Sequence, residues 1–118
     1  MNLREKRIAF SLAISRLIVW ANENLHGFGV AFGEGYVALT DGKDGDHDGP
    51  HKAGGAHYTG LGTDLVMWED ATGRYVSEGG HPAFRALGER WERMDSLARW
   101  GGRFSDDNHF SFFHEGRS

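Results

Sequence analysis

The feature that most constrains this chain is a long one-sided run of apolar residues near its start. Between positions 3 and 25, apolar side chains recur at three- and four-residue spacing, the period of one face of an α-helix. The residues that share this face are Phe10, Ala13, Ile14, Leu17, Ile18, Ala21 and Leu25. We therefore expect a helix from about Leu3 to Asn24 that ends near Gly27, because a flexible glycine backbone suits a helix stop.

The same segment superficially resembles a secretory signal, since the basic residues Arg4, Lys6 and Arg7 precede an apolar run. Against this reading, Glu5 lies within the basic region, Arg16 interrupts the apolar run, and no small-residue cleavage site follows. We expect the helix to remain part of the mature fold. No stretch reaches the roughly 18 apolar residues that a membrane-spanning helix needs, so stable membrane insertion is not expected.

The length of 118 residues is that of one ordinary domain, so we treat residues 1–118 as a single unit. The absence of cysteine excludes a disulfide scaffold and a thiolate metal site. With 13 Lys and Arg against 17 Asp and Glu, the formal net charge is -4. A chain with that balance has no general electrostatic attraction to nucleic acid.

The remaining segments predict a small α+β domain. Short apolar runs indicate strands, glycine- and aspartate-rich stretches indicate loops, and a proline followed by helical spacing indicates a second helix. In chain order we expect a strand or hairpin over Val30–Thr40, a loop over Asp41–Gly55, a strand over Leu61–Trp68, a turn at Asp70–Gly73, a helix from Pro82 to about Asp95, a loop over Trp100–Asn108 and a strand over His109–Phe113.

Two clusters carry residues suited to metal chemistry. His57 and Asp64 lie seven positions apart, where a bend at an intervening glycine could direct both side chains to one point. A catalytic zinc takes three His, Asp or Glu ligands and keeps one position open. The same spacing also fits a loop histidine and an aspartate bonded to backbone amides, and spacing alone does not choose between them.

The second cluster places Asp106 and Asp107 three and two positions before His109, which begins an aromatic strand. Neighbouring phenylalanines give a histidine a dry setting that favours its neutral, metal-binding form. A zinc hydrolase also needs a carboxylate that moves protons during the reaction. The alternative is a satisfied core histidine after a solvated turn or an Asx turn. In either case we expect the Asp107 side chain to point to solvent or to backbone amides of that turn.

Together these motifs resemble a known family. The pattern His-x6-Asp, followed by Trp-Gly-Gly-x-Phe over 100–104 and Asp-x-x-His-Phe over 106–110, is similar to zinc D-Ala-D-Ala carboxypeptidases and L-alanyl-D-glutamate endopeptidases, and above all to their small phage endolysin members. The opening helix and Phe-Gly-Glu-Gly-Tyr over 32–36 resemble the lead-in of those enzymes, so the likeness covers nearly the whole chain.

The resemblance implies a hedgehog / D-Ala-D-Ala peptidase-like fold, an antiparallel sheet with flanking helices and a zinc site in a surface cleft. By the same resemblance His57, Asp64 and His109 hold Zn²⁺, and Asp106 is the catalytic carboxylate. The implied activity is metallopeptidase cleavage of stem peptides or cross-bridges of bacterial peptidoglycan. The implied protein is made in the host cytoplasm and acts on the cell wall after release. We expect a monomer, although the sequence itself does not reveal the oligomeric state.

Two positions depart from the family pattern. Gly55 stands where a serine usually precedes the first histidine, and Val37 stands where an arginine usually positions the substrate. These departures keep a second hypothesis open, a catalytically impaired member of the same fold that binds the wall or serves a structural role. A third hypothesis is a metal-binding protein whose functional part is the loop that carries His47 and His51.

Overall fold

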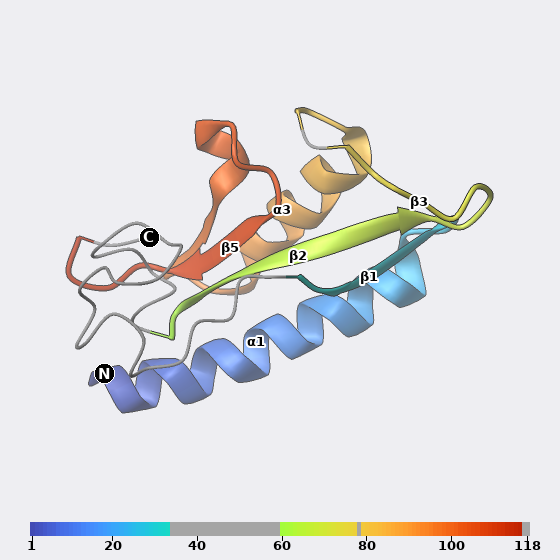
Figure 1. Ribbon diagram of the computed structural model, residues 1–118. Helices are drawn as coiled ribbons and strands as arrows, with labels where there is room; N and C mark the ends of the chain where they lie inside the picture. Colours follow the sequence, from blue (N-terminus) through green and yellow to red (C-terminus); the bar gives the residue numbers. More distant parts are fainter. Residues whose placement is uncertain (34–59, 78, 117–118) are drawn as a thin grey trace.

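The structure is a computed structural model that describes residues 1–33, 60–77 and 79–116. Within these ranges it contains two α-helices, five strands and one short 3-10 helix (Figure 1). Their bounds in chain order are α1 Leu3–Asn24, β1 Phe28–Phe32, β2 Gly62–Glu69, β3 Arg74–Tyr75, α3 Pro82–Met94, β4 Ala98–Trp100, η1 Gly101–Phe104 and β5 His109–Phe112.

The first helix has the predicted bounds. Its start is fixed by a capping box, in which the Asn2 side chain accepts the Glu5 amide N–H and the Glu5 carboxylate accepts the Asn2 amide N–H. One face is buried, with Phe10, Ile14 and Leu17 at most 5% exposed. Among the described residues, neither helix combines the length and the apolar character needed to cross a bilayer.

The sheet is antiparallel throughout, with strand order β1-β2-β5-β4 and with β3 paired to β2. The long strand β2 is central, because it pairs with β1 along most of its length and with β5 near its start (Figure 1). The expected strands over Leu61–Trp68 and His109–Phe113 are confirmed with boundaries one residue off.

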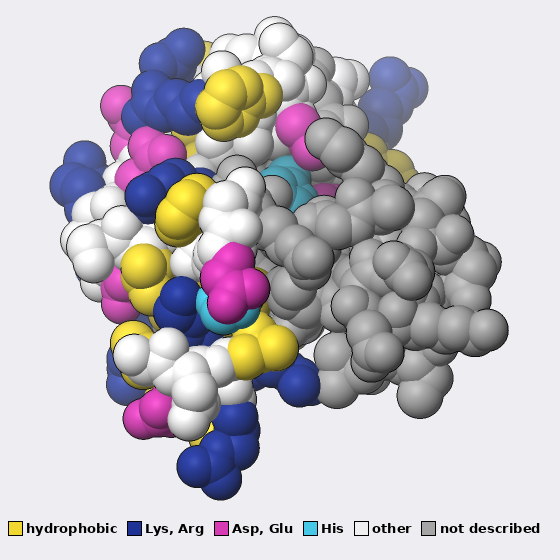
Figure 2. All heavy atoms as spheres, turned by 90° about the vertical axis from the view of Figure 1, so that its left-hand side faces the viewer, with side chains coloured by type: hydrophobic (Ala, Val, Ile, Leu, Met, Phe, Trp, Pro, Cys, Tyr) yellow, Lys and Arg dark blue, Asp and Glu magenta, His cyan; other side chains and the backbone are white. Residues whose placement is uncertain are grey.

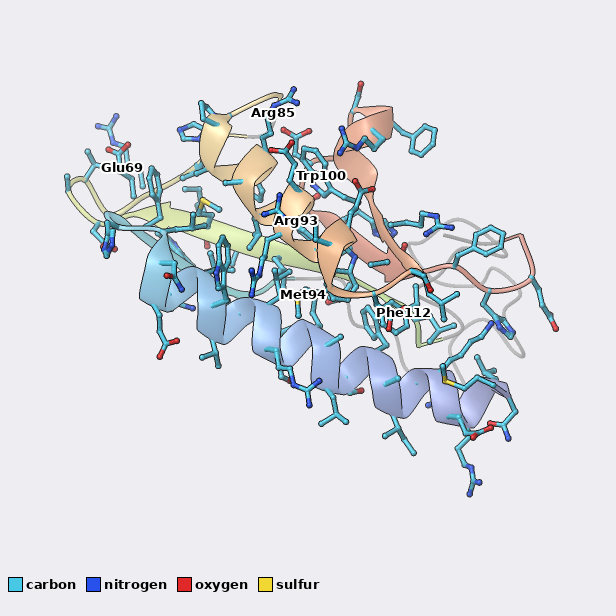
Figure 3. The ribbon with its side chains drawn as sticks, turned by 180° about the vertical axis from the view of Figure 1, so that it is seen from behind. Glu69, Arg85, Arg93, Met94, Trp100 and Phe112 are labelled. Carbon is cyan, nitrogen blue, oxygen red and sulfur yellow. The ribbon has the colours of Figure 1, made fainter. Side chains whose placement is uncertain are left out.

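Both helices pack against the same face of the sheet (Figures 1 and 3). The core between the two layers is aromatic: Trp91 of α3 stacks on Phe112 of β5 at 5.4 Å between ring centroids, and Phe10 of α1 meets both rings edge-on. The Trp91 indole N–H is shared between the carbonyls of Arg99 and Ser111, so the one polar atom of this ring is satisfied inside the core.

An amide side chain ties α1 to the edge strand β1. The Asn22 carbonyl oxygen accepts the Val30 N–H at 3.0 Å, and the Asn22 amide nitrogen donates to the Val30 carbonyl at 2.9 Å. This pairing satisfies two backbone groups of a strand that has a sheet neighbour on only one side among the described elements. It therefore fixes where α1 ends relative to the sheet.

The prediction of an uninterrupted loop over Trp100–Asn108 is wrong at its start. Trp100 is the last residue of β4 and pairs with Phe110, and the next four residues form η1. The two-residue strand β3 was also not foreseen. The second helix and the turn at 70–73 are confirmed. The expected loop over 41–55, and the part of the expected first strand beyond Gly33, lie outside the described residues.

Candidate functional site

Two of the predicted metal ligands face each other across neighbouring strands. Asp64 of β2 is the register partner of His109 of β5. The next pair is joined by a hydrogen bond from the Leu65 amide to the Asn108 carbonyl, so Asp64 and His109 occupy the close, non-hydrogen-bonded type of pair. Their side chains meet, with His109 Nδ1 3.4 Å from Asp64 Oδ1.

The pair lies on the sheet face opposite the helices. Leu65 and Met67 of β2 are buried in the core, and successive side chains of a strand point to opposite faces. Asp64 therefore points away from α1 and α3, and the same alternation places His109 opposite the buried Phe110. The two side chains remain partly accessible, at 25% for Asp64 and 13% for His109. Figure 2 shows histidine side chains beside acidic ones at this end of the molecule.

The third described candidate, Asp106, is brought towards His109 by a tight turn. The Asp106 amide donates to the Gly101 carbonyl at 2.9 Å, and the His109 amide donates to the Asp106 carbonyl at 3.1 Å. A Cβ atom added to Gly101 would lie 3.2 Å from the Cβ of Asp106 and 2.8 Å from that of His109. The Cβ atoms of Asp106 and His109 are therefore at most about 6 Å apart, and both side chains start beside the same glycine.

Gly101 is required for this approach. Its added Cβ would also lie 2.4 Å from the Asp106 carbonyl oxygen, which is closer than real Cβ contacts come. Any side chain at position 101 would push the turn away from the strand end. The second residue of the Trp-Gly-Gly sequence thus allows Asp106 and His109 to converge.

Trp100 braces this turn from the side of α3 (Figure 3). Its indole is 4% exposed and lies so close to Gly88 and Gly102 that a Cβ at either would come within 2.1 Å of the ring. The indole N–H donates to the Asp107 carbonyl at 2.7 Å. The motif residues from Trp100 to Gly102 therefore connect α3 to the turn that carries Asp106, a role that the sequence alone did not indicate.

An exposed ion pair covers the outer side of this indole. Arg103 donates from Nε and Nη2 to Glu92 Oε1 at 3.1 and 2.8 Å, and its guanidinium lies 5.4 Å from the centroid of the Trp100 ring. Hydrogen bonding to Glu92, together with the charge of that carboxylate, holds the pKa of Arg103 above its ordinary value. The other Glu92 oxygen accepts the Trp100 amide N–H at 3.3 Å.

The Asp107 side chain has a structural role, and its hydrogen-bond partners differ from those expected. The sequence suggested solvent or the amides of its own turn, but the side chain is 4% exposed and reaches the segment before α3. One carboxylate oxygen, Oδ2, accepts the amide N–H groups of Gly79 at 3.0 Å and Gly80 at 2.7 Å. Both glycines have positive φ angles, 103° and 95°, which permit this clamp.

The remaining predicted residues lie outside the described residues. These are the expected ligand His57, the loop histidines His47 and His51, and the departures Val37 and Gly55. Among described residues alone, no group of three or more His, Asp or Glu side chains is arranged to hold a metal ion. Two of the three expected ligands and the expected catalytic carboxylate are thus gathered at one end of β5.

The chain matches no protein-family model and no curated protein.

Proposed function

We propose that the chain is a zinc metallopeptidase that cleaves peptides of bacterial peptidoglycan, with the fold and the endolysin-like role of the family that its motifs resemble. The observation that carries this proposal is the pairing of Asp64 with His109 at the end of β5, in the turn region that also holds Asp106. In the proposal His57, which lies outside the described residues, is the third ligand.

The spacing of the two described ligands supports the proposal. Zinc takes histidine nitrogen at about 2.0–2.1 Å and carboxylate oxygen at about 2.0–2.2 Å in tetrahedral geometry, so two ligand atoms lie roughly 3.3–3.5 Å apart. The observed separation of His109 Nδ1 and Asp64 Oδ1 is 3.4 Å. The two atoms therefore have the spacing of two ligands of one tetrahedral zinc ion, and partial burial leaves the pair accessible to a substrate.

In this reading zinc supplies Lewis-acid polarisation of a peptide carbonyl and activation of water. Asp64 and His109 hold their positions because paired strands fix their backbones. Asp106 takes a proton from the attacking water and delivers it to the leaving amine. Gly101 and Trp100 keep the Asp106 turn against the strand end, beside His109.

The test of this proposal is the release of new amino groups from purified peptidoglycan. The Asp106→Asn variant should keep its zinc and its fold but lose about a hundredfold or more in turnover, the usual scale for loss of a general acid–base group. Asp107→Asn keeps an oxygen that can accept from Gly79 and Gly80, so its turnover should change much less. Asp70→Asn, an exposed aspartate in the β2–β3 turn, is the matched control.

The outcomes separate the leading hypothesis from its alternatives. No amine release by a zinc-loaded wild-type protein would favour the impaired, wall-binding member of the fold. Equal losses in Asp106→Asn and Asp107→Asn would mean that the wrong carboxylate has been assigned. Mass spectrometry of the products from purified muropeptides then identifies which peptide bond is cut.

A further inference from the structure

A second feature of the molecule, independent of the candidate zinc site, is an apolar stripe on the outer side of α1. Ile8, Leu12 and Val19 are spaced by four and seven residues, so they line up along one side of the helix. Phe10 and Leu17, which belong to the core, lie on the opposite side. The stripe is exposed: 58% for Ile8, 52% for Leu12 and 55% for Val19.

A groove continues the stripe towards the sheet. It has a volume of about 790 Å³ and lies between the first half of α1, the end of β1 and the start of β2. Ile8 and Leu12 line it together with Phe32, which is 57% exposed. Isolated exposed apolar side chains are common on proteins, but Ile8, Leu12 and Phe32 gather at one groove, which is typical of an interaction surface.

The charges around the patch are predominantly positive. Arg4 and Arg7 line the groove at the start of the helix, and Arg16 is exposed beside the stripe. Over its whole length α1 carries four basic residues against two acidic ones, Glu5 and Glu23, a net charge of +2 in a chain whose net charge is -4. Figure 2, which looks onto the end where α1 begins, shows Lys and Arg side chains around hydrophobic ones in its lower part.

The two acidic residues leave this asymmetry in place. Glu5 accepts the Asn2 amide N–H in the capping box, and Glu23 lies at the far end of the helix from Arg4 and Arg7. Lys6 points towards the C-terminal segment, where its ammonium nitrogen lies 3.0 Å from His114 Nδ1. Glu5 lies seven residues before Leu12 and Glu23 lies four residues after Val19, so each end of the stripe carries an acidic residue. Among the described residues that line the groove, however, the charged ones are Arg4 and Arg7.

We propose that this face of α1 binds the surface of a bilayer rich in anionic lipids. A helix that lies in the membrane interface combines apolar side chains with flanking Lys or Arg, and each basic residue near an anionic surface adds to the attraction. The apolar stripe enters the boundary between headgroups and acyl chains, and Arg4, Arg7 and Arg16 contact lipid phosphates. Charge complementarity selects this partner, because arginines are the charged side chains among the described residues that line the groove.

Co-sedimentation of the full chain with lipid vesicles tests the proposal. We expect binding to vesicles of equal parts phosphatidylglycerol and phosphatidylcholine, at least tenfold weaker binding to pure phosphatidylcholine, and weakening as NaCl rises from about 0.1 M to about 0.5 M. Ile8→Asn with Leu12→Asn should lose at least tenfold in binding, and Arg4→Gln with Arg7→Gln roughly tenfold or more. Phe104→Asn, at an 82% exposed residue of η1, should bind as wild type does.

The substituted side chains are more than half exposed or lie at the rim of the groove, so circular dichroism and zinc content should not change. Equal binding to neutral vesicles, no binding to anionic ones, or undiminished binding by the Ile8/Leu12 double variant would overturn the proposal. So would a wild-type dimer, measured by light scattering, that the double variant converts to monomer, since the patch would then join two copies of the chain.

Discussion

Replacing Asp107 by alanine removes the hydrogen bonds that join the turn carrying Asp106 to the segment before α3. The N–H groups of Gly79 and Gly80 donate to one carboxylate oxygen of Asp107 at 3.0 and 2.7 Å. Hydrogen bonds to a charged acceptor contribute about 1.5–3 kcal/mol each. Gly79 and Gly80 are exposed, so their N–H groups regain water in the variant, and the loss falls around the lower end of the summed range, about 3 kcal/mol. We expect Asp107→Ala to lower the free energy of unfolding by about 2–4 kcal/mol.

For a chain of this length that loss corresponds to a fall in Tm of roughly 8–16 °C. Urea and thermal unfolding followed by tryptophan fluorescence measure it, with Asp70→Ala as a control that should stay within about 0.5 kcal/mol of wild type. Asp107→Asn should fall between the two, because the amide keeps an acceptor oxygen but lacks the charge. An Asp107→Ala variant as stable as the control would show that the clamp does not stabilise the fold.

Three further substitutions test the packing around the site and the contact between α1 and β1. Trp100→Phe keeps an aromatic ring but loses the buried N–H bond to the Asp107 carbonyl, so unfolding in urea should show a loss of about 1–2 kcal/mol. Gly101→Ala places a Cβ 2.4 Å from a carbonyl oxygen and should weaken zinc binding in a chelator competition, whereas unchanged affinity would argue against the convergence described above. Asn22→Ala frees both backbone groups of Val30, and the Val30 amide should exchange with solvent at least tenfold faster by NMR.

Much of the fold follows from residue spacing. The one-sided pattern from Phe10 to Leu25 predicts α1, and Pro82 with Phe84, Leu87 and Trp91 predicts α3, because each pattern repeats over several helical turns. β2 and β5 are short apolar runs bounded by turn residues. The sequence does not predict β3 and β4, because strands of two or three residues are too short to carry a periodic signal.

The sequence names residues for the candidate site, but it does not show how the fold brings them together. The family resemblance of the motifs proposes Asp64 and His109, which are 45 positions apart, but only the strand register places their side chains opposite each other. The contact from Asp107 to Gly79 and Gly80 spans 28 and 27 positions, and no local pattern distinguishes it from the expected Asx turn. Long-range contacts of this kind depend on how the layers pack.

Zinc content after extensive dialysis tests the central claim most directly. We expect one zinc ion per wild-type chain, and more than roughly a hundredfold loss of affinity in both Asp64→Ala and His109→Ala, because even changes to groups that support a ligand cost 10–100-fold. Asp106→Ala should retain zinc, since Asp106 is assigned a proton-transfer role and not a ligand role. A wild-type chain without zinc, or unchanged zinc content in both ligand variants, would contradict the account.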